Sequence, residues 1–359
     1  MHVAVEASRL RREVRGIGRY VRALLPRLLE ESPGLRLTLY PRLLDVRAVE
    51  SYVASDPRTR GRVAVLPAPL LRVARADVAW YPWNVAFPLP GRGGIAVSMH
   101  DVAPLVSANA RVGTRGHRRW LHRYHCTAER ADVFIMNSDF TAAEAHRVLG
   151  VPRERMRVAL LAADDLPLEP PDPARDADAL DRLGIRPPFV LAVGADEPRK
   201  NFALLERAMA TVAGQHPEAT LVIVGARAAR TGEGAPAWRR TLGVVSDPDL
   251  LALYRGATCF VMPSTYEGFG LPVLEAMRHG TPVVCARSSS LPEVAGDAAV
   301  WFDPADEHAL ALALQAVLSD DALRARLRAA GIARAARFSW RDTARATLDA
   351  FEEVASAAR

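Results

Sequence analysis

Short apolar runs alternate with segments of helical periodicity along the first half of the chain. The expected strands lie at residues 3–5, 35–40, 63–66, 78–81, 95–99 and 133–136. Helical patterns separate several of them, most clearly at 16–30, 118–130 and 141–149. Nearly continuous apolar strands that alternate with helices are typical of a parallel sheet covered on both faces. The pattern therefore predicts a doubly wound α/β domain over residues 1–165.

A second alternation of the same kind follows a proline-rich stretch at residues 164–188. Its expected strands lie at 189–193, 221–224, 259–262, 283–286 and 299–302, after a short helix near 177–183. Proline-rich stretches of this kind are typical of domain linkers. Beyond residue 306 the chain has helical spacing, with breaks expected near Gly331 and Ser339. We therefore expect a second α/β domain over 166–339 and a final helix over 340–359.

One segment, residues 263–304, carries the strongest chemical signal. Glu267 and Glu275 are separated by seven residues, and Pro272 between them suits the first turn of a helix. Glu267 is therefore expected in a loop and Glu275 one turn into the helix, whose free N–H groups favour phosphate. Two carboxylates beside such an anion site can accept hydrogen bonds from the hydroxyls of a phosphorylated sugar. The alternative interpretation is a connecting loop with two solvated carboxylates. The loop residues are Gly268, Phe269, Gly270 and Leu271.

Lys200 is the only lysine among the 47 basic residues of the chain. It follows the expected strand at 189–193 and lies in the string Pro198-Arg199-Lys200-Asn201. The compact ammonium group of lysine, on its flexible stem, can neutralise a diphosphate as a point charge. The planar guanidinium group of arginine cannot freely replace it in this role. We therefore interpret Lys200 as a phosphate ligand, with Arg199 in the same role.

Composition narrows the class of protein. Half of the 359 residues are hydrophobic and a quarter are charged, as in ordinary soluble globular proteins. No apolar run approaches the ~20 residues of a membrane span, and residues 1–8 lack the pattern of a signal peptide. Three cysteines without metal-ligand spacing suit a reducing cytosol, so a cytoplasmic location is expected.

The basic residues are concentrated in the first half of the chain. Residues 1–170 carry 26 arginines against 17 acidic residues, whereas the remainder carries 21 basic and 24 acidic residues. This excess suggests peripheral contact with an anionic membrane, or only a coding preference for arginine. A patch of basic and aromatic residues at helical spacing has two interpretations: the same membrane contact, or a solvated helix face whose aromatic rings pack inward. Nucleic acid would compete for such a patch, but it is not expected as a partner. The patch consists of Arg115, Arg118, Arg119, Trp120, Arg123 and Tyr124.

The segment that begins at Glu267 resembles the retaining glycosyltransferases of family 4, which have the GT-B fold. The resemblance rests on the Glu-x7-Glu arrangement and continues through 280–284 and 291–294. The string at 198–201 also resembles the diphosphate-binding motif of that family. The resemblance implies two Rossmann-like domains that face each other across a cleft, an N-terminal one for the acceptor and a C-terminal one for the nucleotide sugar. It further implies that the last helix crosses back to the N-terminal domain.

The resemblance also implies roles for individual residues. Glu267 would accept hydrogen bonds from hexose hydroxyls and Glu275 from the ribose, while Lys200 and Arg199 would stabilise the leaving diphosphate. His100, at the end of the strand at 95–99, would contact the hexose near the reacting carbon from the opposite domain. A glycine turn would face the donor phosphates, and a backbone segment would lie by the nucleotide base. These last positions are Gly16 and Gly18 for the turn and Val245 and Ser246 for the backbone segment.

The expected activity is retaining transfer of a hexosyl group from a nucleoside diphosphate sugar to a glycan or lipid-linked acceptor in polysaccharide biosynthesis. GDP-mannose is slightly favoured as donor. No cofactor or metal is expected, because Asp176-x-Asp178 and Asp247-Pro-Asp249 do not follow a strand as a metal-dependent transferase requires. Both pairs are interpreted as helix caps. A nucleotide-sugar epimerase on the same fold and a non-catalytic sugar-nucleotide-binding protein remain as alternatives.

Overall fold

The computed structural model describes residues 1–11, 16–87, 90, 92–106, 114–165, 172–225 and 236–357. The chain divides into two compact units. Unit 1 comprises Met1–Asp165 together with Ser339–Arg359, and unit 2 comprises Leu166–Phe338. This division falls within one residue of each boundary expected from the sequence. Of the expected linker, residues 166–171 lie outside the described residues.

Unit 1 is built on a parallel sheet whose described strands follow the order β3-β2-β1-β4-β5-β6-β7. The inner strands are almost fully buried; all four residues of β6 are, for example. Strands buried on both faces need helices on both sides of the sheet. The strands are β1 (His2–Glu6), β2 (Arg36–Tyr40), β3 (Val63–Val65), β4 (Arg75–Tyr81), β5 (Arg92–Met99), β6 (Val133–Met136) and β7 (Met156–Val158).

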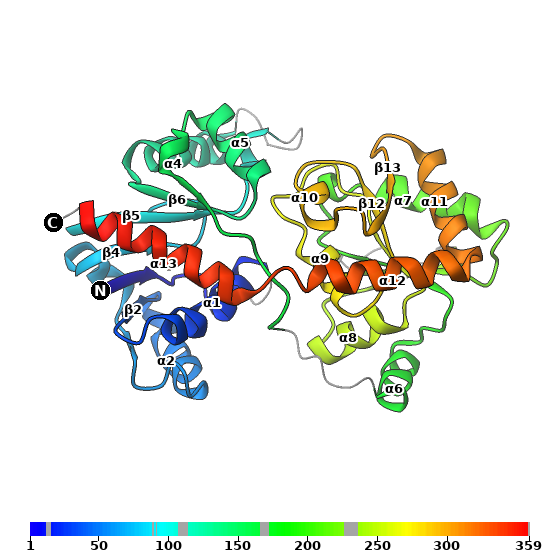
Figure 1. Cartoon of the computed structure of the whole chain (residues 1–359), viewed down its shortest axis with the longest axis horizontal. Helices are drawn as coiled ribbons and strands as arrows, with labels where there is room; N and C mark the ends of the chain where they lie inside the picture. The colour runs from blue at the N-terminus through cyan, green and yellow to red at the C-terminus, as the bar shows by residue number, and fades with distance from the viewer. Residues whose placement is uncertain are drawn as a thin grey trace. The chain divides into compact units, whose positions relative to one another are not determined.

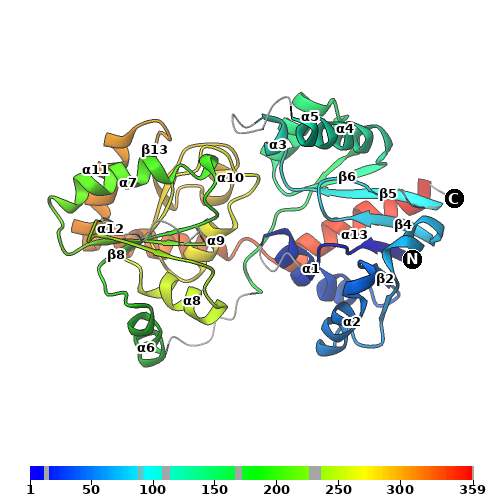
Figure 2. The same cartoon turned by 180° about the vertical axis from the view of Figure 1, so that it is seen from behind.

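The last helix of the chain completes the core of unit 1. α13 (Trp340–Ala357) lies across β4 and β5 and packs against α1, as Figures 1 and 2 show from opposite sides. Trp340 and Phe351 on this helix are fully buried. The other described helices are α1 (Ile17–Glu31), α2 (Val46–Ser55), α3 (Ala103–Val106), α4 (Arg115–Arg130) and α5 (Asp139–Leu149), with 3-10 turns η1 (Leu43–Asp45), η2 (Ala68–Val73) and η3 (Arg153–Arg155).

Unit 2 repeats the architecture with a second parallel sheet, whose described strands follow the order β10-β9-β8-β11-β12-β13. The strands are β8 (Phe189–Val193), β9 (Thr220–Val224), β10 (Arg239–Leu242), β11 (Cys259–Met262), β12 (Val283–Ala286) and β13 (Ala299–Phe302). The helical segments are α6 (Pro173–Leu183), η4 (Pro198–Lys200), α7 (Phe202–Ala213), α8 (Asp247–Gly256), α9 (Leu271–Arg278), α10 (Leu291–Ala295), α11 (Glu307–Ser319) and α12 (Asp321–Ala335). None of the helices in the described part of the chain has the length and apolarity that a membrane crossing requires.

The observed elements confirm the predicted α/β fold class of two doubly wound parallel sheets. Every expected strand is present, and β7 and β10 are additional. The expected break near Gly331 is wrong, because α12 continues through this residue. A Cβ at Gly331 would lie 3.2 Å from the Met277 side chain, so the glycine allows α12 to pack closely on α9. The glycine here serves close packing between helices and does not end one.

Each sheet has one position where the strand order reverses. In unit 1 it lies between β1 and β4, and in unit 2 between β8 and β11. Open parallel sheets bind ligands outside the carboxyl ends of the strands at such a position. In unit 2 the segments that leave this position carry Lys200, after β8, and Glu267, after β11.

Candidate functional site

The loop after β8 is fixed so that Lys200 lies over the carboxyl end of the sheet. A Cβ at Gly194 would lie 3.2 Å from Cε of Lys200, so a larger residue there would press on the lysine stem. Asn201 adopts a left-handed conformation with φ of 56°. Its Nδ2 donates hydrogen bonds to the carbonyls of Pro263 at 3.2 Å and Pro304 at 2.9 Å. These bonds tie the loop to the ends of β11 and β13.

The loop after β11 is held by two serines that follow β12. The amide of Glu267 donates a hydrogen bond to Ser289 Oγ at 2.9 Å. Ser290 Oγ lies 2.9 Å from the carbonyl oxygen of Glu267 and 2.8 Å from that of Phe269, to which its hydroxyl can donate. Gly270 has φ of 110°, and a Cβ there would lie 2.7 Å from the Leu291 side chain. A bulkier residue would therefore distort the turn that begins α9.

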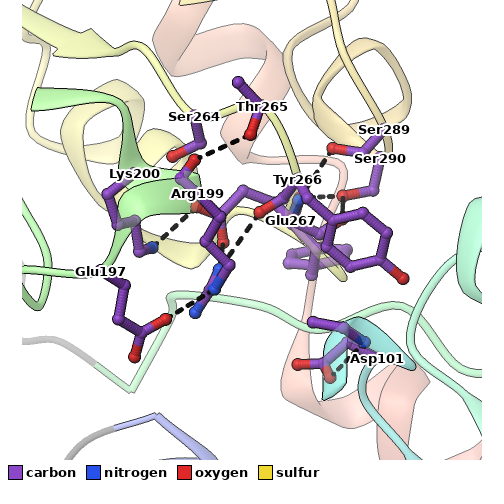
Figure 3. Close-up of polar contacts among 12 residues, drawn as sticks. Asp101, Glu197, Arg199, Lys200, Ser264, Thr265, Tyr266, Glu267, Ser289 and Ser290 are labelled. Atoms are coloured by element: carbon purple, nitrogen blue, oxygen red, sulfur yellow. Dashed lines mark hydrogen bonds and ion pairs between the residues drawn. The ribbon is translucent and has the colours of Figure 1, made fainter. Parts of the chain in front are cut away.

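These two loops bring three of the predicted site residues together in an ion cluster (Figure 3). Lys200 Nζ donates to Glu267 Oε1 at 2.7 Å, and Arg199 Nη1 donates to Glu267 Oε2 at 3.1 Å. Arg199 Nε also donates to Glu197 Oε2 at 2.6 Å. Burial alone would raise the pKa of Glu267, but the charges of Lys200 and Arg199 outweigh it and hold that pKa below its ordinary value. The site therefore contains a buried carboxylate that is ionised at neutral pH beside two cations.

Glu275 lies on α9, as expected, but its carboxylate already has a protein partner. Tyr254 on α8 donates its hydroxyl hydrogen to Glu275 Oε2 at 2.7 Å, and only 6% of Glu275 is exposed. A ribose hydroxyl that reaches Glu275 would share it with Tyr254. Sequence analysis did not identify Tyr254, because a tyrosine in the apolar pattern of a helix is ordinarily a core residue.

The glycine loop and the first turn of α9 contribute backbone groups to the site more than they contribute side chains. Phe269 is buried, and its ring meets the edge of Phe338 at a centroid distance of 6.1 Å. Phe269 is thus an anchor of the loop within unit 2. Gly268, Gly270 and Leu271 precede or begin the helix, where amide hydrogens lack intrahelical acceptors.

Val245 and Ser246 precede α8. The hydroxyl of Ser246 caps this helix: it accepts the amide hydrogen of Asp249 at 3.3 Å and donates to Asp249 Oδ2 at 2.7 Å. Because this hydroxyl is committed to the cap, the contact with a nucleotide base that the sequence predicts would fall to the backbone and stays a prediction.

The interpretation of the Asp-x-Asp pairs as caps is wrong in detail. Asp247 and Asp249 lie inside the first turn of α8, where they complement the helix dipole. For α6 the cap is Asp172, and Asp176 accepts a hydrogen bond from Arg255 Nε at 2.6 Å. Within the described residues, no three His, Cys, Asp or Glu side chains are grouped as metal binding requires.

His100 and the glycine turn belong to unit 1. His100 follows β5 and is buried, with Nε2 donating to the Pro82 carbonyl at 3.0 Å. Burial lowers the pKa of His100 to about 4, so the ring is neutral at physiological pH and Nδ1 carries the lone pair. Its ring lies 4.7 Å from that of Tyr20 on α1, the helix that Gly16 precedes and that contains Gly18. The structure thus brings His100 close to the helix that the glycine turn begins.

The predicted basic and aromatic patch forms part of α4. Tyr124 packs inward and is 1% exposed, as the solvated-face interpretation expects. Trp120 is only half-buried, with the guanidinium groups of Arg9 and Arg123 at 5.6 and 5.8 Å from its ring centroid. Arg123 also lies 4.7 Å from the ring of Phe87, which is 53% exposed. The membrane contact stays a prediction.

Four residues that hold the site together were not identified from sequence: Asn201, Tyr254, Ser289 and Ser290. The serines left a signal, since they end a run of three serines that begins two residues after the strand at 283–286, at the same sheet edge as Glu267. Asn201 left a weaker one, as asparagine is among the few residues that tolerate a left-handed conformation.

Comparison with known proteins finds a family match within unit 2. Residues 181–334 match the model of the family described as glycosyl transferases group 1. O-antigen chain mannosyltransferase B of Escherichia coli is 36% identical over 244 residues, which cover 64% of this chain and 62% of that protein. The chain thus aligns with somewhat less than two thirds of this relative's length.

Two solved structures share the fold over nearly the whole chain. Sucrose-phosphate synthase from Thermosynechococcus elongatus has a TM-score of 0.73 at 21% identity, covering 99% of this chain and 100% of that one. Anabaena HepE in complex with UDP and glucose has a TM-score of 0.74 at 17% identity, covering 98% of this chain and 100% of that one. Residues 181–334 are thus similar in sequence to the group 1 glycosyltransferases, and the two parallel-sheet units have the GT-B fold of these structural neighbours.

Proposed function

We propose that this chain transfers a hexosyl group, with retention of configuration, from a nucleoside diphosphate sugar to a hydroxyl of a glycan or lipid-linked acceptor in polysaccharide biosynthesis. The observation that supports it most is the cluster of Lys200, Arg199 and Glu267 where the strand order of unit 2 reverses. Two cations there can neutralise a diphosphate, and a buried ionised carboxylate can accept hydrogen bonds from sugar hydroxyls.

In this mechanism the bond between the hexose C1 and the phosphate oxygen breaks, and its electron pair stays on the phosphate. Lys200 and Arg199, together with the amides at the start of α9, stabilise that growing negative charge. The acceptor oxygen forms the new bond to C1 on the same face, and its proton passes to an oxygen of the departing phosphate. Neutral His100 accepts a hydrogen bond from a substrate hydroxyl through Nδ1.

The mannosyltransferase relative supports a mannosyl donor, which makes GDP-mannose the first donor to test. The test is a thermal-shift screen with UDP-, GDP- and dTDP-sugars, followed by chromatography of the reaction products with the donor that shifts the protein. Transfer or donor hydrolysis is expected in the wild type. We expect Lys200→Ala to weaken nucleotide binding strongly, because it removes the only lysine and with it one of the two cations assigned to the diphosphate. Lys200→Arg should bind better than Lys200→Ala but less tightly than the wild type.

The products separate this proposal from its alternatives. An isomerised nucleotide sugar would indicate an epimerase. Nucleotide binding without any turnover would indicate a sugar-nucleotide-binding protein, and no binding of any nucleotide sugar would overturn the proposal.

A further inference from the structure

Glu267 engages the same cations that the proposed function assigns to the diphosphate. One of its oxygens accepts from Lys200 Nζ at 2.7 Å and the other from Arg199 Nη1 at 3.1 Å. Both Glu267 and Lys200 are more than nine-tenths buried, at 7% and 8% exposure. A diphosphate that reaches these cations must therefore share them with a carboxylate.

We propose that Glu267 is an internal counter-ion of Lys200 and Arg199 that weakens binding of the nucleoside diphosphate product and so promotes its release. This inference rests on the proposed function and adds a second role for Glu267, separate from contact with the sugar.

The formal charges of the cluster cancel before any ligand is considered. Lys200 and Arg199 supply two positive charges, and Glu267 and Glu197 supply two negative ones. Glu197 counts for less, because 48% of its side chain is exposed and water screens its charge. The carboxylate of Glu267 is 9% exposed, so its repulsion of a nearby phosphate is screened far less.

This repulsion differs between the donor and the product. In the donor, the terminal phosphate is esterified to the hexose, carries a single negative charge and brings hydroxyl groups that can donate to Glu267. After transfer, the terminal phosphate approaches two negative charges near pH 7, because its second pKa is about 6. The hydroxyl donors leave with the hexose. Glu267 therefore disfavours the product more than the donor.

The main chain leaves Glu267 little freedom to move away. Its amide donates to Ser289 Oγ at 2.9 Å, and its carbonyl accepts from Ser290 Oγ at 2.9 Å. On the opposite loop, Asn201 ties the backbone next to Lys200 to the ends of two strands. Movement of the main chain is therefore restricted, and separation of the carboxylate from the cations requires rotation of side chains.

The test is isothermal titration calorimetry of the wild type and Glu267→Gln with UDP, GDP and dTDP. Glutamine keeps the size of the side chain and removes its charge. We expect Glu267→Gln to bind the preferred nucleoside diphosphate about tenfold more tightly, as removal of one like charge in a buried site implies. The same variant should turn over more slowly and be inhibited by product at lower concentration.

Three further variants isolate the effect of charge. Glu267→Ala removes the charge in a second way and should also tighten binding. Glu267→Asp keeps the charge and should bind the nucleoside diphosphate no more tightly than the wild type. The double variant Lys200→Ala/Glu267→Gln should bind more tightly than Lys200→Ala, but by a smaller factor than separates Glu267→Gln from the wild type. The reason is that Glu267→Gln releases two cations in the wild type and only one when Lys200 is absent.

Equal or weaker binding by Glu267→Gln and Glu267→Ala, with thermal unfolding of the variants unchanged, overturns the inference and leaves the proposed function standing. Tightening by Glu267→Asp as large as that by Glu267→Gln also overturns it. A wild type that binds none of the three nucleoside diphosphates overturns the proposed function, and this inference with it.

Discussion

Buried carboxyl groups in this protein have pKa values shifted in opposite directions because their neighbours differ. Glu267 keeps a lowered pKa in spite of burial, since two cations contact it. Glu6, at the end of β1, has a raised pKa, because burial outweighs its hydrogen bonds with Ser8 and its more distant arginines. His100 is driven neutral by burial, and the Pro82 carbonyl only partly offsets this. The sequence identified Glu267 and His100 as candidates, but it could not give these charge states, because they depend on contacts between distant segments.

The lowered pKa of His100 predicts a pH dependence of stability. The unfolded chain binds a proton at this histidine near pH 6.5, whereas the folded protein does so only near pH 4. Between these values the unfolded state holds more protons, so the contribution is complete above pH 6.5 and is lost as pH falls toward 4. We expect the stability of the wild type relative to His100→Gln to fall by roughly 2–3 kcal/mol between pH 7 and pH 4.5.

This difference can be measured by urea unfolding of both proteins across the pH range. His308→Gln, at an exposed position, is the control and should show no comparable change relative to the wild type. A His100 ring that titrates near pH 6.5 in an NMR experiment would contradict the expectation.

At the scale of elements, the sequence predicted all the inner strands and two edge strands, β3 and β13, and missed the other two edge strands. The missed strands β7 and β10 are edge strands, and both contain arginine: Met156–Val158 has one, and Arg239–Leu242 has two. Charged residues on edge strands discourage pairing with other chains, and they also remove the apolar run by which a strand is detected. The long-range hydrogen bonds of Ser289 and Ser290 could not be predicted either, because no local pattern specifies a partner in another loop.

The packing of α13 on β5 predicts a position that cannot accept a side chain. A Cβ built at Gly94 would overlap the Val354 side chain on α13. Gly94→Ala should therefore destabilise unit 1 by about 1–3 kcal/mol through overpacking. Chemical denaturation followed by fluorescence of the buried Trp80 and Trp340 would measure it.

Gly34→Ala is the matched control for this substitution. A Cβ at Gly34 has no heavy atom within 4 Å and its φ is not in the left-handed region. Its effect should stay within about 0.5 kcal/mol, as is usual for surface substitutions. Equal effects of the two substitutions would show that α13 adjusts its position freely.

At the scale of the whole molecule, the two units differ in whether each is formed from one continuous segment of the chain. Unit 2 is one continuous segment, whereas unit 1 needs residues from both ends of the chain. Several hydrogen bonds join these two segments in unit 1; for example, Trp340 Nε1 donates to Asp165 Oδ1, and the Trp340 amide donates to Asp164 Oδ1, each at 2.9 Å.

Removal of residues 339–359 should therefore affect the two units unequally. Unit 1 would lose Trp340, Phe351 and Val354 from its core, a loss expected to abolish its cooperative unfolding. Unit 2 would keep its ion cluster and should still bind a nucleoside diphosphate. Differential scanning calorimetry and titration with the nucleotide that the full chain prefers would measure both outcomes, and a truncated protein with both transitions intact would contradict them.

The discontinuity of unit 1 also sets an order of events during protein synthesis. Domains generally fold as units while the chain emerges from the ribosome, and those nearest the N-terminus usually fold first. Here β4 and β5 must wait for α13, which is translated after the whole of unit 2, so unit 2 can be completed before unit 1. Until then the part of the nascent sheet that α13 covers is exposed, and its protection from aggregation depends on how soon α13 follows unit 2 out of the ribosome.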